Sequence, residues 1–238
     1  MQQFFLTDEK IEDHHFIVTG ETFVHISKSL RLKSGEKVVF CDGKGYEYLC
    51  EICDFKNDSV VVKILSKSES NSEPKLKITI FQCLPKSDKF EDIIKRCVQY
   101  GAFEFVPVMS ERCIAKLNEN KLQRLYKISK SAAMQSKRAI IPQVRNAVRF
   151  SDAIKLMCDF ENAVICYENE SQNTISKLSV KGNSFAALIG PEGGFSEQEA
   201  KLAIDNGIIP ISLGKRILRT EEAAAFLIPI LLLKSGEI

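Results

Sequence analysis

Hydrophobic and polar residues alternate along the first third of the chain, which is the pattern of half-buried β-strands. The alternating stretches are separated by turn-forming residues, and Asp42-Gly43-Lys44-Gly45 between the first two is typical of a hairpin. Strands are predicted at 37–41, 46–53 and 59–65, with a short helix at 22–30. Together these elements predict a small β-barrel domain over residues 1–70.

Residues 66–74 are polar and show no apolar periodicity, so we expect a linker there. Beyond it, apolar runs of strand length alternate with segments of helical periodicity. Strands are predicted at 76–84, 103–109, 162–168, 185–189 and 208–213, and helices at 87–100, 121–138, 150–159, after Ser196 and after Thr220. This alternation favours a parallel α/β sheet in a second domain over residues 74–238. The pattern alone favours an unknotted, doubly wound order, because true knots are very rare.

Two of the predicted strands end in glycine-rich loops, at Gly190-Pro191-Glu192-Gly193-Gly194 and at Gly214. Ser196 and Glu199 have the spacing of a capping box, so a helix should follow the first loop. Thr220 should cap the helix after the second loop, whose first turn holds acidic residues that suit the helix dipole. Because the carboxyl ends of parallel strands meet at one edge of a sheet, the two loops predict a ligand cleft. Ordinary turns, with glycine serving only the backbone geometry, are the alternative.

These loops lack the two common phosphate-binding patterns. Neither contains G-x-G-x-x-G, and the P-loop pattern fails because position 209 is Ile and Arg216 follows Lys215. The loops offer main-chain amides and apolar side chains, which suit a flat, largely uncharged heterocycle better than a polyphosphate. The candidate cofactor-binding residues are Leu188, Ile189, Gly190, Gly193, Leu213, Gly214, Ile217 and Leu218.

The loop sequences also carry a family resemblance. LIGPEGGFSEQE from Leu188 and SLGKRILRTEEAA from Ser212 closely resemble the two cofactor loops of the bacterial small-subunit (16S) ribosomal RNA uracil-N3 methyltransferases, a family of the SPOUT class. Further segments match in the family's order: HISKSLRLKSG from His25, FQCLPKSDKFEDIIK from Phe81, VMSERC from Val108 and AAMQSKRAIIP from Ala132. The chain departs from the family pattern at Gln2-Gln3, at Gln99-Tyr100 and at Glu222.

The resemblance implies S-adenosyl-L-methionine as the cofactor, bound by the two glycine loops. It implies a SPOUT-type trefoil-knotted parallel sheet with an N-terminal PUA-like small β-barrel that binds RNA. It further implies a homodimer, with the apolar helix after Thr220 near its interface, and 16S rRNA in the small ribosomal subunit as the substrate.

Charge restricts where RNA contacts can arise. The net charge of +2 is too small to indicate a polyanion partner, so any contacts must come from local clusters. One cluster is Lys28, Arg31 and Lys33 in the N-terminal domain. The other consists of Arg124, Lys127, Lys130, Lys137 and Arg138, which share one arc of the predicted 121–138 helix with no acid on that arc. We expect both clusters to contact the RNA backbone, with solvated surface residues as the alternative.

The eight cysteines do not indicate a disulfide framework, because the chain is long and the first residues do not lead us to expect a signal peptide. We therefore expect a cytoplasmic protein with reduced thiols. Cys50 and Cys53 have zinc-like spacing, but in a strand they would face opposite sides, so no metal site is expected. The longest apolar run, 223–233, is too short to span a bilayer and contains Pro229, which argues against a membrane partner.

Methyl transfer from a sulfonium needs alignment of the nucleophile with the methyl group and loss of the proton from uracil N3. Arg219 is the candidate cation for the uracil anion, and an ion pair with Glu192 or Glu221 is its alternative. Glu192 is the candidate base, or else a brace for its own loop. Arg112, at the predicted sheet edge, would clamp a phosphate or the target ribose.

For Arg112 a salt bridge to Glu111 or Glu104 is the alternative.

The target uracil is modified on its Watson–Crick edge, so it must be unpaired or flipped into the site. The predicted function is S-adenosylmethionine-dependent methylation of N3 of one uridine in small-subunit ribosomal RNA. Two alternatives stay open: a SPOUT enzyme that modifies a ribose 2′-OH or another base, and a non-enzymatic RNA-binding factor in ribosome assembly.

Overall fold

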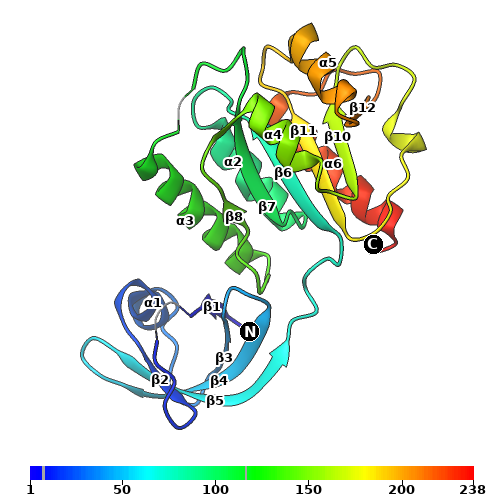
Figure 1. Ribbon diagram of the computed structural model, residues 1–238. Coiled ribbons are helices and arrows are strands. Elements are labelled where there is room, and N and C mark those ends of the chain that lie inside the picture. The colour runs from blue at the N-terminus through cyan, green and yellow to red at the C-terminus, as the bar shows by residue number, and fades with distance from the viewer. Residues whose placement is uncertain (7–8, 116) are drawn as a thin grey trace. The chain divides into compact units, whose positions relative to one another are not determined.

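The computed structural model describes residues 1–6, 9–115 and 117–238, which form two compact units (Figure 1). The first unit comprises residues 1–73 and 133–141, and the second comprises 74–132 and 142–238. The segment 133–141, which the sequence pattern assigns to the second domain, thus packs with the first unit. No helix among the described residues is long and apolar enough to cross a membrane.

The first unit is built on a five-stranded sheet in the order β1-β3-β4-β5-β2. Its strands are β1 (Gln3–Phe5), β2 (His15–Val18), β3 (Lys37–Cys41), β4 (Tyr46–Phe55) and β5 (Val60–Glu69). The sheet surrounds an apolar core in which Phe4, Phe16 and Phe40 are in ring contact. The strands predicted from alternation are confirmed as β3, β4 and β5. β1 and β2 were not predicted, because three or four residues are too few to show a period.

Two smaller predictions for this unit have clear outcomes. The helix predicted at 22–30 is present as α1 (Gly20–Val24), which continues into a π-helical turn, η1 (His25–Ser29). Cys50 is buried and Cys53 is exposed, as predicted for residues on opposite faces of a strand.

The predicted linker at 66–74 is wrong in its first part, although the boundary between the two units does fall inside it, after residue 73. β5 runs to Glu69, which pairs with Tyr46 across the hairpin. The N–H of Ser70 then donates to the Gly45 carbonyl at 2.8 Å, so the polar stretch continues the packing of the first unit. Its polarity reflects the exposed side chains of residues 66–69.

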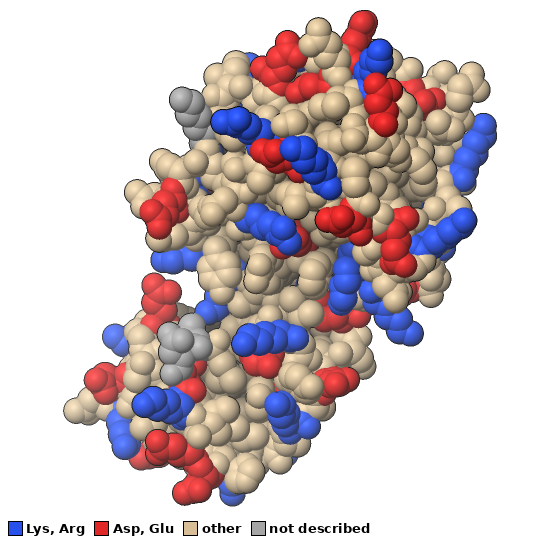
Figure 2. All heavy atoms as spheres, viewed as in Figure 1, with Lys and Arg blue, Asp and Glu red and all other residues tan. Residues whose placement is uncertain are grey.

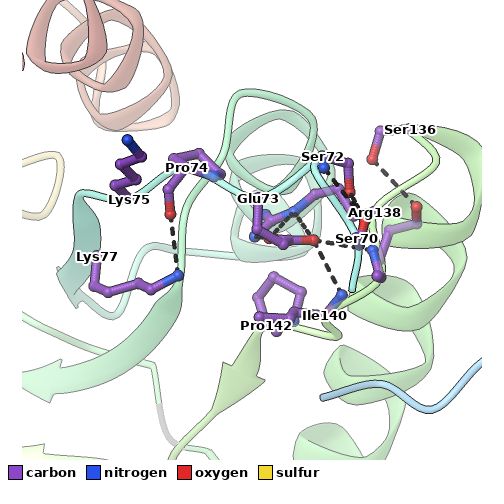
Figure 3. Close-up of polar contacts among 12 residues, drawn as sticks. Ser70, Ser72, Glu73, Pro74, Lys75, Lys77, Ser136, Arg138, Ile140 and Pro142 are labelled. Carbon is purple, nitrogen blue, oxygen red and sulfur yellow. Dashed lines mark hydrogen bonds and ion pairs between the residues drawn. The ribbon is translucent and has the colours of Figure 1, made fainter. Parts of the chain in front are cut away.

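A buried ion pair fixes the segment 133–141 to the first unit. Arg138 Nη2 lies 2.6 Å from Glu73 Oε2, and the two side chains are only 4% and 8% exposed (Figure 3). The other carboxylate oxygen of Glu73 accepts the N–H groups of Ala139 and Ile140 at 2.9 and 3.0 Å. Gln3 Nε2 donates to the Arg138 carbonyl at 2.6 Å. The charge of Arg138 is therefore neutralised inside the unit.

The second unit has a seven-stranded, wholly parallel sheet in the order β12-β10-β11-β6-β7-β8, with β9 also paired to β7. Its strands are β6 (Lys77–Cys83), β7 (Glu104–Met109), β8 (Gln143–Val144), β9 (Val148–Arg149), β10 (Asn162–Cys166), β11 (Ser184–Ile189) and β12 (Ile209–Ile211). The predicted parallel α/β sheet is confirmed, and only the two-residue strands β8 and β9 were not anticipated.

Helices cover both faces of this sheet (Figure 1). They are α2 (Lys89–Gln99), α3 (Glu119–Gln135), α4 (Phe150–Met157), α5 (Glu197–Asp205) and α6 (Thr220–Ser235), with a 3₁₀ turn, η2 (Ile175–Lys177). α2 packs against α6 on one face, and α4 packs against α5 on the other. Alternate strand residues serve the two faces: Phe81 and Cys83 join the core under α4, whereas Gln82 points to the start of α6. The trefoil knot itself stays a prediction from the resemblance.

Candidate active site

A pocket of about 140 Å³ lies where strands β10, β11 and β12 end at one edge of the sheet. Its lining residues are Cys166 to Glu168, Ile189 to Pro191, Gly194, Phe195, Ile211 to Leu218, Thr220 and Ala223. β10 lies between the two strands whose glycine loops predict the cleft, so a third loop contributes Tyr167 and Glu168. These two residues were missed, because strand order is not visible in local sequence.

Thr220 ties the start of α6 to the glycine loop after β11. Its hydroxyl donates to the Gly190 carbonyl at 2.6 Å and accepts from Gln82 Nε2 at 2.9 Å. The prediction that Thr220 caps α6 is wrong: Arg219 occupies the N-cap position, and its side chain makes no capping bond. The Thr220 hydroxyl instead holds the start of α6 against the loop after β11, at one wall of the pocket. Thr220 and Gln82 are buried and Gly190 is nearly so, which shields these bonds from water.

Glycine is required in these loops for two different reasons. Gly194 and Gly214 adopt φ values of +66° and +126°, a region that side-chain-bearing residues rarely adopt. At Gly190 the constraint is packing, since an added Cβ would lie 3.1 Å from the Phe195 ring. A Cβ at Gly194 would overlap the carboxylate of Glu168. These small residues therefore keep the loops close to each other at the pocket wall.

Charge in the pocket is unevenly placed. Glu168, in the loop after β10, is the one carboxylate among the lining residues that the structure describes, while Lys215 and Arg216 both belong to the loop after β12. A carboxylate beside apolar side chains and open main chain suits a ligand with a cationic group and a flat ring. The donor set thus fits a sulfonium cofactor.

Most of the predicted cofactor-binding residues are brought together here. Ile189, Gly190, Leu213, Gly214, Ile217 and Leu218 all line the pocket. Leu188 does not, because it is fully buried in the core under α4. Gly193 lies outside the lining and offers its carbonyl to Arg112 Nη1 at 2.5 Å.

Glu192 is held by cations and by main-chain N–H groups. Its carboxylate lies 3.1 Å from Lys89 Nζ and accepts the Lys86 N–H at 3.2 Å. Burial would raise the pKa of Glu192, but these partners outweigh it and lower the pKa below 4.5. A carboxylate so stabilised is a weak base, and its contacts are those of a brace.

The predicted ion pairs of the two candidate arginines are not formed. Lys89, rather than Arg219, bridges Glu192 and Glu221, lying 3.3 Å from the latter. Arg219 is exposed between two lining residues and makes no ion pair within the described part of the chain. Arg112 bonds the Gly193 carbonyl, while Glu104 pairs with Arg145 at 2.7 Å.

The predicted basic arc on α3 is smaller than its sequence suggests. α3 ends at Gln135, so Arg138 is not on the helix, and it is buried against Glu73. Arg124 pairs with Glu91 of α2 at 2.9 Å. Lys127 and Lys130 form no ion pair with any described residue. The prediction that no acid opposes these basic residues is therefore wrong. Glu91 and Glu73, which neutralise Arg124 and Arg138, come from other parts of the chain.

In the first unit Lys28 and Arg31 are both exposed, and Arg31 has a positive φ of 53°. On the face seen in Figure 2, basic and acidic side chains are interspersed. The surface in view therefore carries no extended field of one sign, consistent with the net charge of +2.

Matches to family models and to named relatives show that the chain belongs to the RNA methyltransferases. The model of the RNA methyltransferase domain matches residues 71–232, and that of the RNA methyltransferase PUA domain matches residues 18–65. The chain is 35% identical to Ribosomal RNA small subunit methyltransferase E of Bacillus subtilis, over 95% of this chain and 94% of that protein. It is 32% identical to the protein of the same name in Synechocystis, over 90% and 72% of the two chains.

Solved structures agree with this assignment. The crystal structure of Ribosomal RNA small subunit methyltransferase E from Neisseria gonorrhoeae bound to S-adenosyl methionine has a TM-score of 0.89 at 26% identity, covering 98% of this chain and 97% of that one. A Legionella pneumophila methyltransferase in complex with its bound cofactor SAM has a TM-score of 0.87 at 28% identity, covering 97% and 96%. The fold is therefore that of these enzymes along the whole chain.

Proposed function

We propose that this chain transfers the methyl group of S-adenosyl-L-methionine to N3 of a uridine in small-subunit ribosomal RNA. The observation that carries the proposal is the pocket of three loops, in a chain similar over its whole length to the methyltransferases named above. The apolar residues Ile189, Leu213 and Leu218 would contact the adenine ring. Glu168 would face the cationic end of the cofactor.

When bound, the cofactor supplies an electrophilic methyl group on sulfur, with a neutral thioether as the leaving group. The residues of the chain need only align the uracil and favour loss of its N3 proton, which leaves an anion that forms the new N–CH₃ bond. Arg219 is assigned to stabilise that anion, since it is exposed beside the pocket without an ion pair among the described residues. Glu192 is assigned to brace its loop, and the proton passes to solvent.

The RNA-binding surface is proposed on each unit separately. In the first unit Lys28 and Arg31 are exposed and positively charged. In the second, Lys127 and Lys130 remain available on α3 for phosphate contacts, whereas Arg124 and Arg138 are assigned structural roles. Arg112 orders the glycine loop through Gly193 instead of clamping a phosphate.

A homodimer forms part of the proposal. Phe226 and Leu233 of α6 are 42% and 62% exposed, although the rest of the helix is largely buried. Exposed apolar side chains of this size on one helix suit a contact with a second copy of the chain. A cytoplasmic location completes the proposal, in keeping with an RNA substrate and eight free thiols.

Two measurements test the proposal. Calorimetry with S-adenosylmethionine should show saturable binding, and no heat at millimolar cofactor would favour an RNA-binding factor over an enzyme. Mass spectrometry of 16S rRNA from cells lacking the protein should show loss of one N3-methyluridine, restored by the wild-type gene. Loss of a ribose methyl group instead would establish a different target for the same fold.

A further inference from the structure

Two cysteines, one at the end of β6 and one in the turn after β7, pack in the same core cluster. Cys83 closes β6 and lies in register with Val108 of β7. The chain then turns through Ser110, so that Cys113 returns to the same place: its N–H donates to the Ser110 carbonyl at 3.1 Å, and its Sγ lies 3.7 Å from the Val108 carbonyl. Cys83, Val108 and Cys113 all pack in the core cluster under α4.

The two thiols differ in protonation. Burial raises the pKa of Cys83 well above its usual value, so this thiol stays protonated. The facing Cys83 thiol lowers the pKa of Cys113 to about 6, assisted by the Ser110 hydroxyl at 3.1 Å and opposed by burial. The lowered pKa favours the thiolate at half-buried Cys113 and the raised pKa favours the thiol at Cys83, the arrangement of an attacking and a resolving cysteine.

The turn that carries Cys113 is bonded to the wall of the pocket. Arg112 Nη1 donates to the Gly193 carbonyl at 2.5 Å. The Glu111 N–H donates to Glu199 Oε1 at 2.8 Å, and Glu199 also completes the capping box with Ser196. A displacement of this turn is therefore transmitted to the loop between β11 and α5.

We propose that Cys113 is a site of oxidation by peroxides and forms a reversible disulfide with Cys83, which alters the glycine loop of the pocket. The Cys113 thiolate attacks one oxygen of hydrogen peroxide and displaces hydroxide, giving a sulfenic acid. Cys83 sulfur then displaces the sulfenic oxygen, which leaves as water with the Cys83 proton. The cysteine pair loses two electrons in all, and one peroxide is reduced to two waters once the displaced hydroxide takes a proton from solvent. A small dithiol reverses the reaction by exchange.

Disulfide formation requires the two sulfur atoms to approach to about 2.05 Å, so the turn at 110–113 must move toward β6. That movement would break the bond from Arg112 to Gly193. This part of the inference rests on the proposed cofactor. The oxidised protein should bind S-adenosylmethionine about tenfold more weakly, the loss expected for one charge-assisted hydrogen bond.

The disulfide is tested first, without reference to any cofactor. The full chain is treated with equimolar hydrogen peroxide, alkylated and digested, and the peptides are identified by mass spectrometry. The peptides containing Cys83 and Cys113 should be linked in the wild type and in the control Cys158→Ser, whose thiol is exposed elsewhere. Cys113→Ser should abolish the link, and Cys83→Ser, which keeps a hydrogen-bond donor beside Cys113 but cannot form a disulfide, should leave a sulfenic acid at Cys113 that dimedone traps. Absence of both the link and the trapped adduct overturns the proposal.

Coupling to the pocket is tested by calorimetry on reduced, oxidised and re-reduced protein. We expect about tenfold weaker binding of S-adenosylmethionine after oxidation, full recovery with dithiothreitol, and no response in Cys113→Ser. Unchanged affinity in fully cross-linked protein would refute the coupling. If the reduced protein binds no cofactor at all, the proposed function fails, whereas the peptide map still decides the thiol pair.

Discussion

The hydroxyl of Thr220 donates a hydrogen bond to the carbonyl of Gly190 at 2.6 Å and so joins the last helix to the loop after β11. The same hydroxyl accepts from Gln82, whose side chain is fully buried and whose Oε1 has no partner among the described atoms. One oxygen atom thus connects β6, β11 and α6 behind the pocket. Its position explains why a polar side chain is buried at the start of this helix.

Thr220→Val keeps the shape of the side chain and removes this bond. It removes the partner of the Gly190 carbonyl and of one N–H of the Gln82 amide, whose other bond is to the Cys83 carbonyl, so the free energy of unfolding should fall by about 1–3 kcal/mol. Urea denaturation measures the loss. Thr220→Ser retains the hydroxyl and should restore most of the stability, whereas equal stability of the Val variant would mean that the bond contributes nothing.

Glu168→Gln should weaken cofactor binding without unfolding the protein. The side chain keeps its size, but the pocket loses the carboxylate that we propose faces the cationic end of the cofactor, so the affinity should fall by about tenfold. Calorimetry with S-adenosylmethionine measures the change. Asp159→Asn, an exposed carboxylate outside the pocket, is the matched control and should bind as the wild type does. An unaltered affinity for Glu168→Gln would show that this carboxylate does not face the ligand.

Charge reversal at Lys127 and Lys130 should weaken RNA binding and reduce its salt dependence. Each lost phosphate contact lowers the slope of log affinity against log salt by about 1. Filter binding or fluorescence anisotropy with a 16S rRNA fragment, at several salt concentrations, measures the slope. Lys155→Glu on α4 is the matched control. If the variants at Lys127 and Lys130 bind the RNA fragment as tightly as Lys155→Glu and the wild type do, the two α3 lysines are only solvated surface residues.

Stability should depend on the charge of Glu192 in a defined pH range. Because its pKa is lowered on folding, the carboxylate stabilises the native state above its unfolded pKa near 4.5, and this contribution is lost as the pH falls through the lower folded value. Glu192→Gln should therefore be less stable than the wild type at pH 7. The difference should shrink in acid denaturation below pH 4.5. A constant difference across that range would indicate that lost packing, and not charge, is responsible.

Local sequence was sufficient where a local signal exists. Alternation gave β3 to β5, and the spacing of Ser196 and Glu199 gave the capping box at α5, where both reciprocal bonds are present. The glycine loops were recognisable because glycine in a loop indicates backbone angles that other residues rarely adopt. Gly194 and Gly214 do have such angles. Such features depend on residues close together in the chain.

Relations between distant residues could not be read in this way. Arg138 appeared to be part of a helical arc because nothing near it shows that Glu73, sixty-five residues away, neutralises it. Glu168 was missed because its place in the pocket depends on β10 lying between β11 and β12. Thr220 looked like a helix cap, since its true partners, Gly190 and Gln82, are far from it in sequence.

The ion pair between Glu73 and Arg138 limits how the protein can be divided. The chain leaves the first unit after residue 73, re-enters it at 133 and leaves again after 141. A truncated N-terminal fragment would retain a buried carboxylate and lose its counterion, a change that costs about 3–5 kcal/mol in other proteins. The first unit should consequently be studied by point substitution, or in a circularly permuted chain, and not by expression of residues 1–73 alone.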